Sequence, residues 1–413
     1  MQVQYERCCG IDVHKETVVA CTIVPDGQGK PQKETRTFST MTGDLTELAK
    51  WLKAKACTHV AMESTGVYWK PVYNLLDGSF EILVVNAEHI KKFGDKTDVT
   101  DAEWIADLLR HGLLKGSFIP SAEQRAWRDL TRYRTTLTDD RSREVNRVQK
   151  VLEDANIKLA SVATDVMGVS GRAILDQLIR GKTDPATLAE LAKGRLREKR
   201  AVLEKALLGI FKPHHRFMLI QHLSHIDYLD EQIAKLDAEL DEQMRPFQAT
   251  MMRWDQIPGI NRRIAQVLLA EIGVDLTQFK DAAHLASWAG MCPGNRESAG
   301  KRKSGKTRKG SVWLRRALVE AAHGAARTKD KYFMNLYHRL AGRRGKKRAI
   351  VAVGHSLLVT GYYMITRATD YTDLGANYFD ERNQERVKRQ AVKRLEKLGF
   401  QVQLKLAVSP PVA

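Results

Sequence analysis

Four acidic residues in the first quarter of the sequence stand at the ends of short apolar runs or at the start of a helix. Asp12 closes the run CCGI, and Glu63 closes the run HVAM. Asp98 and Asp101 lie three residues apart, where an amphipathic helical pattern begins. Acids at the ends of neighbouring strands and at a helix start can meet at one point, so the pattern constrains the fold as well as the chemistry.

Four carboxylates at one point repel each other unless cations neutralise them. Mg²⁺ prefers hard oxygen ligands and can bridge carboxylates to phosphate, so the four acids predict a metal-dependent catalytic site. Mn²⁺ is the alternative ion. Taken singly, each acid could be a solvated surface residue, but the set favours Mg²⁺ ligands that are also catalytic: Asp12, Glu63, Asp98 and Asp101.

The region 1–120 is predicted to be an α/β domain. Its order of elements is three strands, helix, strand, helix, strand, helix, which is the order of a RuvC/RNase H-like fold. Thr100 and Glu103 fit a capping box for the last helix. The strands are expected at 8–13, 17–24, 35–39, 58–63 and 81–86, and the helices at 44–55, 68–77 and 101–114.

The overall charge indicates a polyanionic partner. The 413 residues carry a formal net charge of +18. That excess favours a nucleic acid, whose phosphates dominate affinity, over the weaker alternative of a membrane surface. No apolar stretch approaches the roughly 20 residues of a transmembrane helix, and the N-terminus has no secretory pattern. Five cysteines without metal-binding spacing indicate a reduced cytoplasmic protein without structural zinc.

The remaining chain is predicted to be mostly helical, with a central coiled-coil or linker region at 121–248, a C-terminal domain at 249–365 and a basic tail at 366–413. Long amphipathic helices are expected at 134–152 and 225–244. Two interpretations of the second helix stay open, namely an ordinary helical bundle and a coiled coil that joins protomers. Its apolar stripe consists of Ile226, Leu229, Ile233, Leu236 and Leu240.

The C-terminal domain opens on a pattern typical of a helix-hairpin-helix. Gly259 in the turn would let the backbone approach a phosphate, and the following helix offers free N–H groups and the positive end of its dipole. Arg262 and Arg263 add positive charge. A turn that merely starts a helix is the alternative, and the basic surroundings favour phosphate binding.

The segment 296–316 is strongly basic, with nine Lys or Arg residues and one acid, Glu297. A flexible basic loop suits a nucleic-acid backbone, and its cations would also stabilise a serine alkoxide attacking phosphorus. Composition does not choose a nucleophile among Ser298, Ser304 and Ser311, and all three could simply contact phosphate. The candidate backbone-binding residues here are Lys301, Arg302, Lys303, Lys306, Arg308 and Lys309.

Together the motifs GIDVHK, MESTG, KTDVTDAEWIA and GMCPGNRESAGKRKSGKTRKG resemble the DEDD transposases of bacterial insertion sequences. That group includes the Piv/MooV-type DNA invertases and the bridge-RNA-guided recombinases. The resemblance implies a RuvC-like domain whose tetrad is formed by the four acids. It also implies a C-terminal transposase domain whose nucleophilic serine precedes a small-Gly-Lys segment, which here is Ser298. Ala299 departs from the glycine of many members.

The resemblance also implies a mechanism and partners. Ser298 would attack a scissile phosphate beside Mg²⁺ and form a covalent protein–DNA link, and a freed 3′-hydroxyl would later reseal the strand. The implied partners are donor and target DNA, a non-coding bridge RNA and further copies of the chain in a dimer or tetramer, with no membrane. The site would be composite, and the protein would act at the nucleoid in the bacterial cytoplasm.

Two other functions stay open at this stage. A RuvC-like junction nuclease would use the same four acids to activate water and would not need Ser298. A non-catalytic nucleic-acid-binding protein would rely on the helix-hairpin-helix and the basic loops alone, and the acid quartet argues against it.

Overall fold

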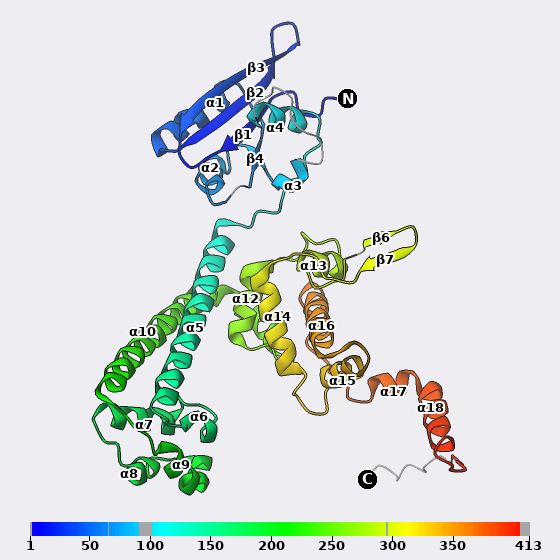
Figure 1. Ribbon diagram of the computed structural model, residues 1–413. Helices are drawn as coiled ribbons and strands as arrows, with labels where there is room; N and C mark the ends of the chain where they lie inside the picture. The colour runs from blue at the N-terminus through cyan, green and yellow to red at the C-terminus, as the bar shows by residue number, and fades with distance from the viewer. Residues whose placement is uncertain (1, 65, 91–100, 295, 405–413) are drawn as a thin grey trace. The chain divides into compact units, whose positions relative to one another are not determined.

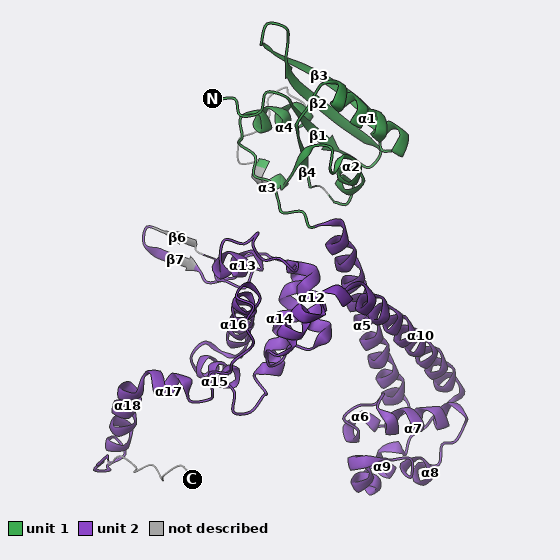
Figure 2. Cartoon of the chain, turned by 180° about the vertical axis from the view of Figure 1, so that it is seen from behind, with its two compact units in different colours: residues 1–120 green, residues 121–413 purple. Residues whose placement is uncertain are grey.

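The computed structural model describes residues 2–64, 66–90, 101–294 and 296–404, with only the backbone described at 88–89, 296–298 and 302–303 (Figure 1). The chain divides into two compact units, residues 1–120 and residues 121–413 (Figure 2). We call them unit 1 and unit 2 and treat each by itself.

Unit 1 is built on a mixed five-stranded sheet with the strand order β3-β2-β1-β4-β5. The strands are β1 (Cys8–Val13), β2 (Thr17–Pro25), β3 (Pro31–Ser39), β4 (His59–Glu63) and β5 (Glu81–Val85). The first three form an antiparallel meander, whereas β4 runs parallel to β1 and β5 runs parallel to β4. This arrangement confirms the predicted order of elements and is compatible with a RuvC-like domain.

Helices cover both faces of the sheet, which explains why β1 and β4 are apolar runs without polar alternation. One face carries α1 (Thr42–Ala54) and α2 (Trp69–Leu76), and the other carries α4 (Asp101–Arg110). The short α3 (Ala87–Ile90) follows β5. Strand β3 starts four residues before the predicted 35–39, because it is an exposed edge strand that needs no apolar residues there.

A glycine allows α4 to lie directly on β1. A Cβ atom on Gly10 would stand 2.2 Å from the carbonyl oxygen of Ala102 and 2.3 Å from the backbone nitrogen of Ala106. No side chain fits there, so the two backbones pack against each other. This contact fixes the first two turns of α4 against the middle of β1.

In unit 2 the long helices α5 (Ala122–Asp154) and α10 (Pro213–Gln243) pack along each other. Within the chain, Leu229 and Ile233 of the predicted apolar stripe pack with Leu137 of α5. The stripe therefore serves an intrachain helical pair here, and coiled-coil joining of protomers stays a prediction. The chain segment that connects these two helices forms α6 (Leu159–Val162), α7 (Val169–Ile179), α8 (Pro185–Ala189) and α9 (Arg200–Leu207). These short helices share one core with the adjoining parts of α5 and α10.

A second core joins the helices after residue 247 to both long helices. Trp127 of α5 and Leu240 of α10 contribute to it, so apolar packing continues across the predicted boundary at 248. Its helices are α11 (Gln248–Asp255), α12 (Arg262–Ile272), α13 (Ala282–Trp288), α14 (Val312–Ala325), α15 (Tyr332–Arg344) and α16 (Lys346–Thr366). The chain then continues into α17 (Tyr378–Arg382) and α18 (Gln384–Glu396).

By length and composition α16 could cross a membrane, which corrects the sequence analysis, where no stretch reached that length. Half of its apolar window is buried inside the protein. Val353, Leu357 and Leu358 are fully buried in the core that α16 shares with α11 to α15. The apolar character of this helix therefore has a packing explanation.

The Gly10 contact yields a stability prediction. Replacing Gly10 by Ala inserts a Cβ atom into the backbone of α4 and should destabilise unit 1 by roughly 3 kcal/mol or more. Thermal unfolding and limited proteolysis of the full chain would show it. Gly43→Ala is the matched control, because nothing lies within 4 Å of its added Cβ. Equal stability of the two variants would contradict the proposed packing.

Candidate active site

Two of the predicted acids lie at the same ends of neighbouring parallel strands. The register of β1 and β4 pairs Ile11 with Met62, and the residues that follow are Asp12 and Glu63. Neighbouring strands lie about 4.8 Å apart, so the two backbones bring these acids close together. Both side chains are partly buried. The strand pairing alone therefore creates a two-carboxylate edge.

Side-chain alternation directs both acids to the face that α4 covers. Cys8 and Ala61 pack on the α4 side of the sheet. Side chains an even number of residues apart on a strand share a face, so Asp12 lies on the face of Cys8 and Glu63 on the face of Ala61. Asp101 is the first residue of α4, next to Ala102, whose carbonyl oxygen approaches Gly10. Three predicted acids thus belong to elements that meet on one face of the sheet.

The fourth acid, Asp98, lies outside the described residues, as does Thr100 of the predicted capping box. Their predicted roles stay predictions. Oxygen donors from strand ends and a helix start fit a hard divalent cation such as Mg²⁺.

Sequence reasoning missed one neighbour of this site. His14 follows β1, and its Nε2 lies 3.1 Å from Oδ2 of Asp12. The histidine side chain is 61% exposed and the aspartate 18%, so the imidazole covers the solvent side of the carboxylate. The only sequence signal was the spacing DVH, with the histidine two residues after the acid.

Ser298 ends the first strand of a two-stranded hairpin in unit 2. Strand β6 (Arg296–Ser298) pairs with β7 (Lys301–Ser304), and Ser298 is opposite Lys301. The two turn residues, Ala299 and Gly300, have φ values of 51° and 71°. A two-residue turn with both φ values positive is the tight hairpin type that favours glycine. The hairpin corrects the prediction of a loop here, because such turn chemistry does not need apolar strands.

The neck of this hairpin is closed by backbone contacts. The N–H of Gly294 donates to the carbonyl of Lys306 over 2.8 Å, and Pro293 forms a bridge with Thr307. At Gly310 an added Cβ would stand 2.5 Å from the nitrogen of Gly290, so these glycines permit the closest approach. The serine hairpin therefore has a fixed base on the helical core.

Arg315 of α14 ties the two sides of the neck together. Its Nη1 donates to Oγ1 of Thr307 over 2.6 Å and to the carbonyl oxygen of Gly290 over 3.3 Å. On α16, Nδ1 of His355 lies 3.7 Å from Sγ of Cys292 in the same neck. Burial raises the pKa of this thiol and lowers the pKa of the imidazole, so the two groups stay neutral near pH 7.

The other two candidate serines have local structural partners. Oγ of Ser304 accepts a hydrogen bond from the backbone N–H of Lys306. Oγ of Ser311 caps α14 by accepting from the N–H of Leu314, and it donates to the buried carboxylate of Glu271 over 2.9 Å. These contacts explain two serines without assigning them any chemistry.

Glu271 is the centre of a buried ionic cluster. Its side chain is 1% exposed on α12, and Arg132 of α5 contacts both of its oxygens at 2.8 and 3.1 Å. Arg128 donates to the carbonyl oxygen of Ala270 at 2.9 Å and lies 3.9 Å from the carboxylate. With Ser311 as a further donor, the cluster joins α5, α12 and the end of the basic segment.

The predicted basic residues of the hairpin region are open to solvent where their side chains are described. Lys301, Lys306, Arg308 and Lys309 are exposed, and none forms an ion pair with another described residue. Arg302 and Lys303 lie on β7, where the backbone alone is described. The exposed cations around the hairpin are therefore available to a polyanion.

The helix-hairpin-helix residues have intramolecular partners. An added Cβ on Gly259 would stand 2.1 Å from the carbonyl oxygen of Ala321, so this glycine is required for packing on α14. Arg262 contacts Asp241 at 2.8 Å, and Arg263 pairs with Asp237. Phosphate binding at this turn stays a prediction, and packing with α10 and α14 already explains the three residues.

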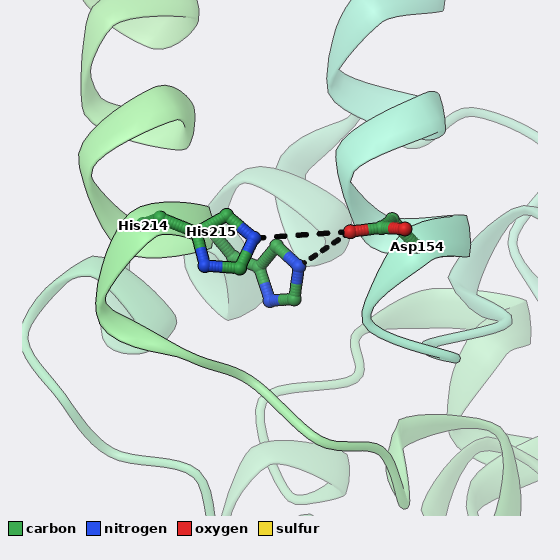
Figure 3. A group of neighbouring side chains, drawn as sticks. All are labelled: Asp154, His214 and His215. Carbon is green, nitrogen blue, oxygen red and sulfur yellow. Dashed lines mark hydrogen bonds and ion pairs between the residues drawn. The ribbon is translucent and has the colours of Figure 1, made fainter.

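Three possible metal ligands meet where α5 ends and α10 begins, namely Asp154, His214 and His215 (Figure 3). Nε2 of His215 lies 2.7 Å from Oδ2 of Asp154, while Nδ1 of His215 accepts the N–H of Lys212. The proton of this imidazole is therefore on Nε2, and the hydrogen bond from His215 lowers the pKa of Asp154. A metal at Nε2 would move that proton to Nδ1, which already accepts a hydrogen bond, so a hydrogen bond from the neutral imidazole to Asp154 fits better than a metal site.

Comparison with known proteins places these features in a class. A family model described as "Transposase", for DEDD transposases of the IS110 type, matches residues 9–157, and a second, "Transposase IS116/IS110/IS902 family", matches residues 253–338. A family 20 transposase of Pseudomonas aeruginosa is 25% identical over 65% of the chain and 71% of its own length. Pilin gene-inverting proteins of Moraxella lacunata and Moraxella bovis are each 25% identical over 86% of the chain and 94% of their own lengths.

These matches define the class of the protein as a DNA transposase, an enzyme that cuts and rejoins DNA strands. The chain belongs to the IS110-type DEDD transposases. The first match contains β1, β4 and α4, and the second contains the serine hairpin.

The turn of the serine hairpin yields a prediction. Ala299 has a positive φ, which costs an L residue about 1–2 kcal/mol, so Ala299→Gly should stabilise the hairpin by about 0.5–1 kcal/mol after the entropy cost of glycine. Hydrogen exchange of the β6–β7 amides should slow by roughly two- to fivefold. Ala299→Val should have the opposite effect, and faster exchange in the glycine variant would contradict the turn geometry.

The Glu271 cluster yields a prediction about the stability of unit 2. Glu271→Gln leaves two partly buried arginines without their anion and should destabilise unit 2 by about 2–4 kcal/mol. The thermal midpoint of the chain should fall by roughly 5–10 °C. Glu320→Gln on the exposed side of α14 is the matched control. If both variants unfold at the same temperature, the cluster does not anchor the basic segment.

Proposed function

We propose that this transposase is an insertion-sequence recombinase that cuts and rejoins DNA through a covalent link between Ser298 and DNA. The main support is the placement of a serine beside the tight turn of a hairpin with a fixed neck and exposed cations around it. A rigid base limits how far the nucleophile can move, which favours a well-defined attack geometry. Ser304 and Ser311 have other hydrogen-bond partners.

The proposed reaction conserves the phosphodiester bond. Oγ of Ser298 attacks the scissile phosphorus, its proton passes to a base, and the bond from phosphorus to the 3′-oxygen breaks, so the 3′-oxygen leaves and takes up a proton. The DNA 5′-phosphate is then esterified to the serine. A 3′-hydroxyl of the exchanged strand attacks the same phosphorus in reverse, and Ser298 leaves. No nucleotide cofactor is needed, because no net bond is lost.

The chain's own charges support both steps. Lys301 is opposite Ser298 in the hairpin, and Lys306, Arg308 and Lys309 are exposed nearby in sequence. Cations at these positions would hold the phosphate and reduce the build-up of negative charge during attack.

The acids of unit 1 would hold Mg²⁺, or Mn²⁺ as the alternative, through Asp12, Glu63 and Asp101, with Asp98 as the fourth predicted ligand. Such an ion polarises the phosphate and stabilises oxyanions. Asp12 and Glu63 fit this role, since both approach the same face of the sheet from the same ends of two strands.

We further propose the partners of this reaction. Donor and target DNA are the substrates, and a structured bridge RNA would select them by base pairing, for which the net charge of +18 provides attraction but no sequence reading. The acids and Ser298 belong to different units, so a dimer or tetramer could join them in one composite site. The Moraxella relatives are named for inverting a pilin gene, which supports site-specific exchange. The enzyme would act in the cytoplasm, at the nucleoid.

The decisive experiment incubates the purified protein with Mg²⁺, the RNA flanking its gene and labelled DNA carrying the element ends. A denaturation-resistant protein–DNA adduct should form. Ser298→Ala and Asp12→Asn should each lower its yield by at least 100-fold, since each removes a group that acts on the phosphate.

Two variants serve as controls in this assay. Ser304→Ala and Glu47→Gln, an exposed acid on α1, should leave the adduct yield within about twofold. Cleaved DNA without an adduct, at full rate in Ser298→Ala, would instead establish hydrolysis by a RuvC-like nuclease that uses water.

A further inference from the structure

A cluster of cations lies where α15 ends and α16 begins, outside both segments matched by the family models. Ten residues from Arg339 to Arg348 contain six cations and no acid. Gly345, with φ at 82°, makes the sharp turn between the helices. We call this cluster the basic corner: Arg339, Arg343, Arg344, Lys346, Lys347 and Arg348.

The charge of the basic corner is largely uncompensated. Arg339 has a distant acid partner, Asp380, at 3.6 Å. Among the residues that the structure describes, the five other cations form no ion pair, and all five are exposed. Lys346 and Lys347 stand in the first turn of α16, where the helix dipole is positive and cations are unfavourable. Their position therefore disfavours the helix, and a bound anion would offset that cost.

Helix α18 extends the positive surface. A groove of about 790 Å³ is lined from α15 by Arg339 and Arg343 and from α18 by Arg386 and Arg394. The cations of α18 number five against two acids. Within the described part of the chain, Lys388 is the one cation of α18 in an ion pair, with Glu385. Arginines from two helices thus face one elongated groove.

The basic corner lies close to the serine hairpin along α16. His355 of this helix contacts Cys292 in the neck of the hairpin. Lys346 precedes His355 by nine residues, which corresponds to about 14 Å of helix rise. One turn of B-DNA spans about 34 Å, so a duplex held near the hairpin would reach the corner within half a turn.

We propose that the basic corner and the groove beside it bind the phosphate backbone of the duplex DNA that flanks the exchange site. The proposal rests on the proposed function only for the choice of DNA as the partner. Next to Arg339, Tyr332 stacks on Phe379, and Tyr378 contacts both rings edge to face. These rings are engaged with one another, so the surface offers cationic head groups rather than free rings for single-stranded bases.

The test measures binding of a labelled 40-base-pair DNA duplex of unrelated sequence by fluorescence anisotropy at several KCl concentrations. EDTA is present, so no strand is cut. The test variant changes Arg343, Arg344, Lys346 and Lys347 to Gln. The control variant removes the same number of charges elsewhere, by changing four exposed residues to Gln: Lys193, Arg195, Arg197 and Lys199.

The corner variant should bind at least tenfold more weakly at about 0.1 M KCl. Its plot of log affinity against log salt should be shallower by about two to four, since each lost phosphate contact removes about 0.9 from the slope. The control should keep the wild-type slope. These results do not depend on Ser298, and a chain that forms no serine adduct could still show them.

Three outcomes would overturn the proposal. Equal losses of DNA affinity in the corner variant and the control would show that net charge alone causes the effect. A loss confined to an RNA duplex of matched sequence would assign the surface to RNA. Unchanged DNA binding with an altered oligomeric state would make it a contact between copies of the chain. Wild-type protein that binds no DNA at all would instead refute the proposed function.

Discussion

The direct packing of α4 on β1 at Gly10 is the contact on which the acidic site depends. Without a side chain at residue 10, the backbone of α4 at Ala102 and Ala106 reaches the strand. Asp101 therefore begins a helix that lies over the face to which Asp12 and Glu63 point. A larger residue would push the helix outward and separate the helix acid from the strand acids. The strand pairing supplies two carboxylates, and this contact adds the third.

Glycines also allow a close backbone approach in unit 2, where Gly290 and Gly310 let the two sides of the hairpin neck come together. Arg315 then bonds to both sides. The end of the basic segment is held by Ser311, which reaches the buried Glu271 between α5 and α12. A segment that is basic, exposed and rich in glycine is thus anchored at both ends. The described cations of this segment are exposed, while backbone contacts hold the neck of the serine hairpin.

Much of unit 1 could be predicted because its signals are local. Apolar runs gave β1, β2, β4 and β5, and amphipathic periodicity gave α1 and α2, all close to their observed bounds. The start of α4 was also predicted, but the helix ends at Arg110, four residues before the predicted 114. The start of β3 was not predicted, because an exposed edge strand carries no apolar signal. Likewise, the first turns of α5 were not predicted, because Gln124 and Arg134 are buried polar residues whose side-chain partners lie over 100 residues away.

Roles that depend on distant neighbours were harder to foresee. The sequence suggested phosphate contact for Gly259, Arg262 and Arg263, but the packing surface for the glycine and the acid partners of the arginines lie on α14 and α10. The hairpin of Ser298 was expected as a loop, since its strands are short and charged. Composition did not distinguish the three serines. The structure adds hydrogen-bond partners for Ser304 and Ser311, while for Ser298 it describes the backbone alone.

The most direct test of the account is to locate the DNA link on the protein by mass spectrometry. After nuclease treatment of the adduct, trypsin separates the three serines, because Ser298 lies alone in peptide 297–301, Ser304 in 304–306 and Ser311 in 310–315. If Ser298 is the nucleophile, a nucleotide mass is found on peptide 297–301. A nucleotide on either of the other peptides, or on none, would contradict the assignment of Ser298 as the nucleophile.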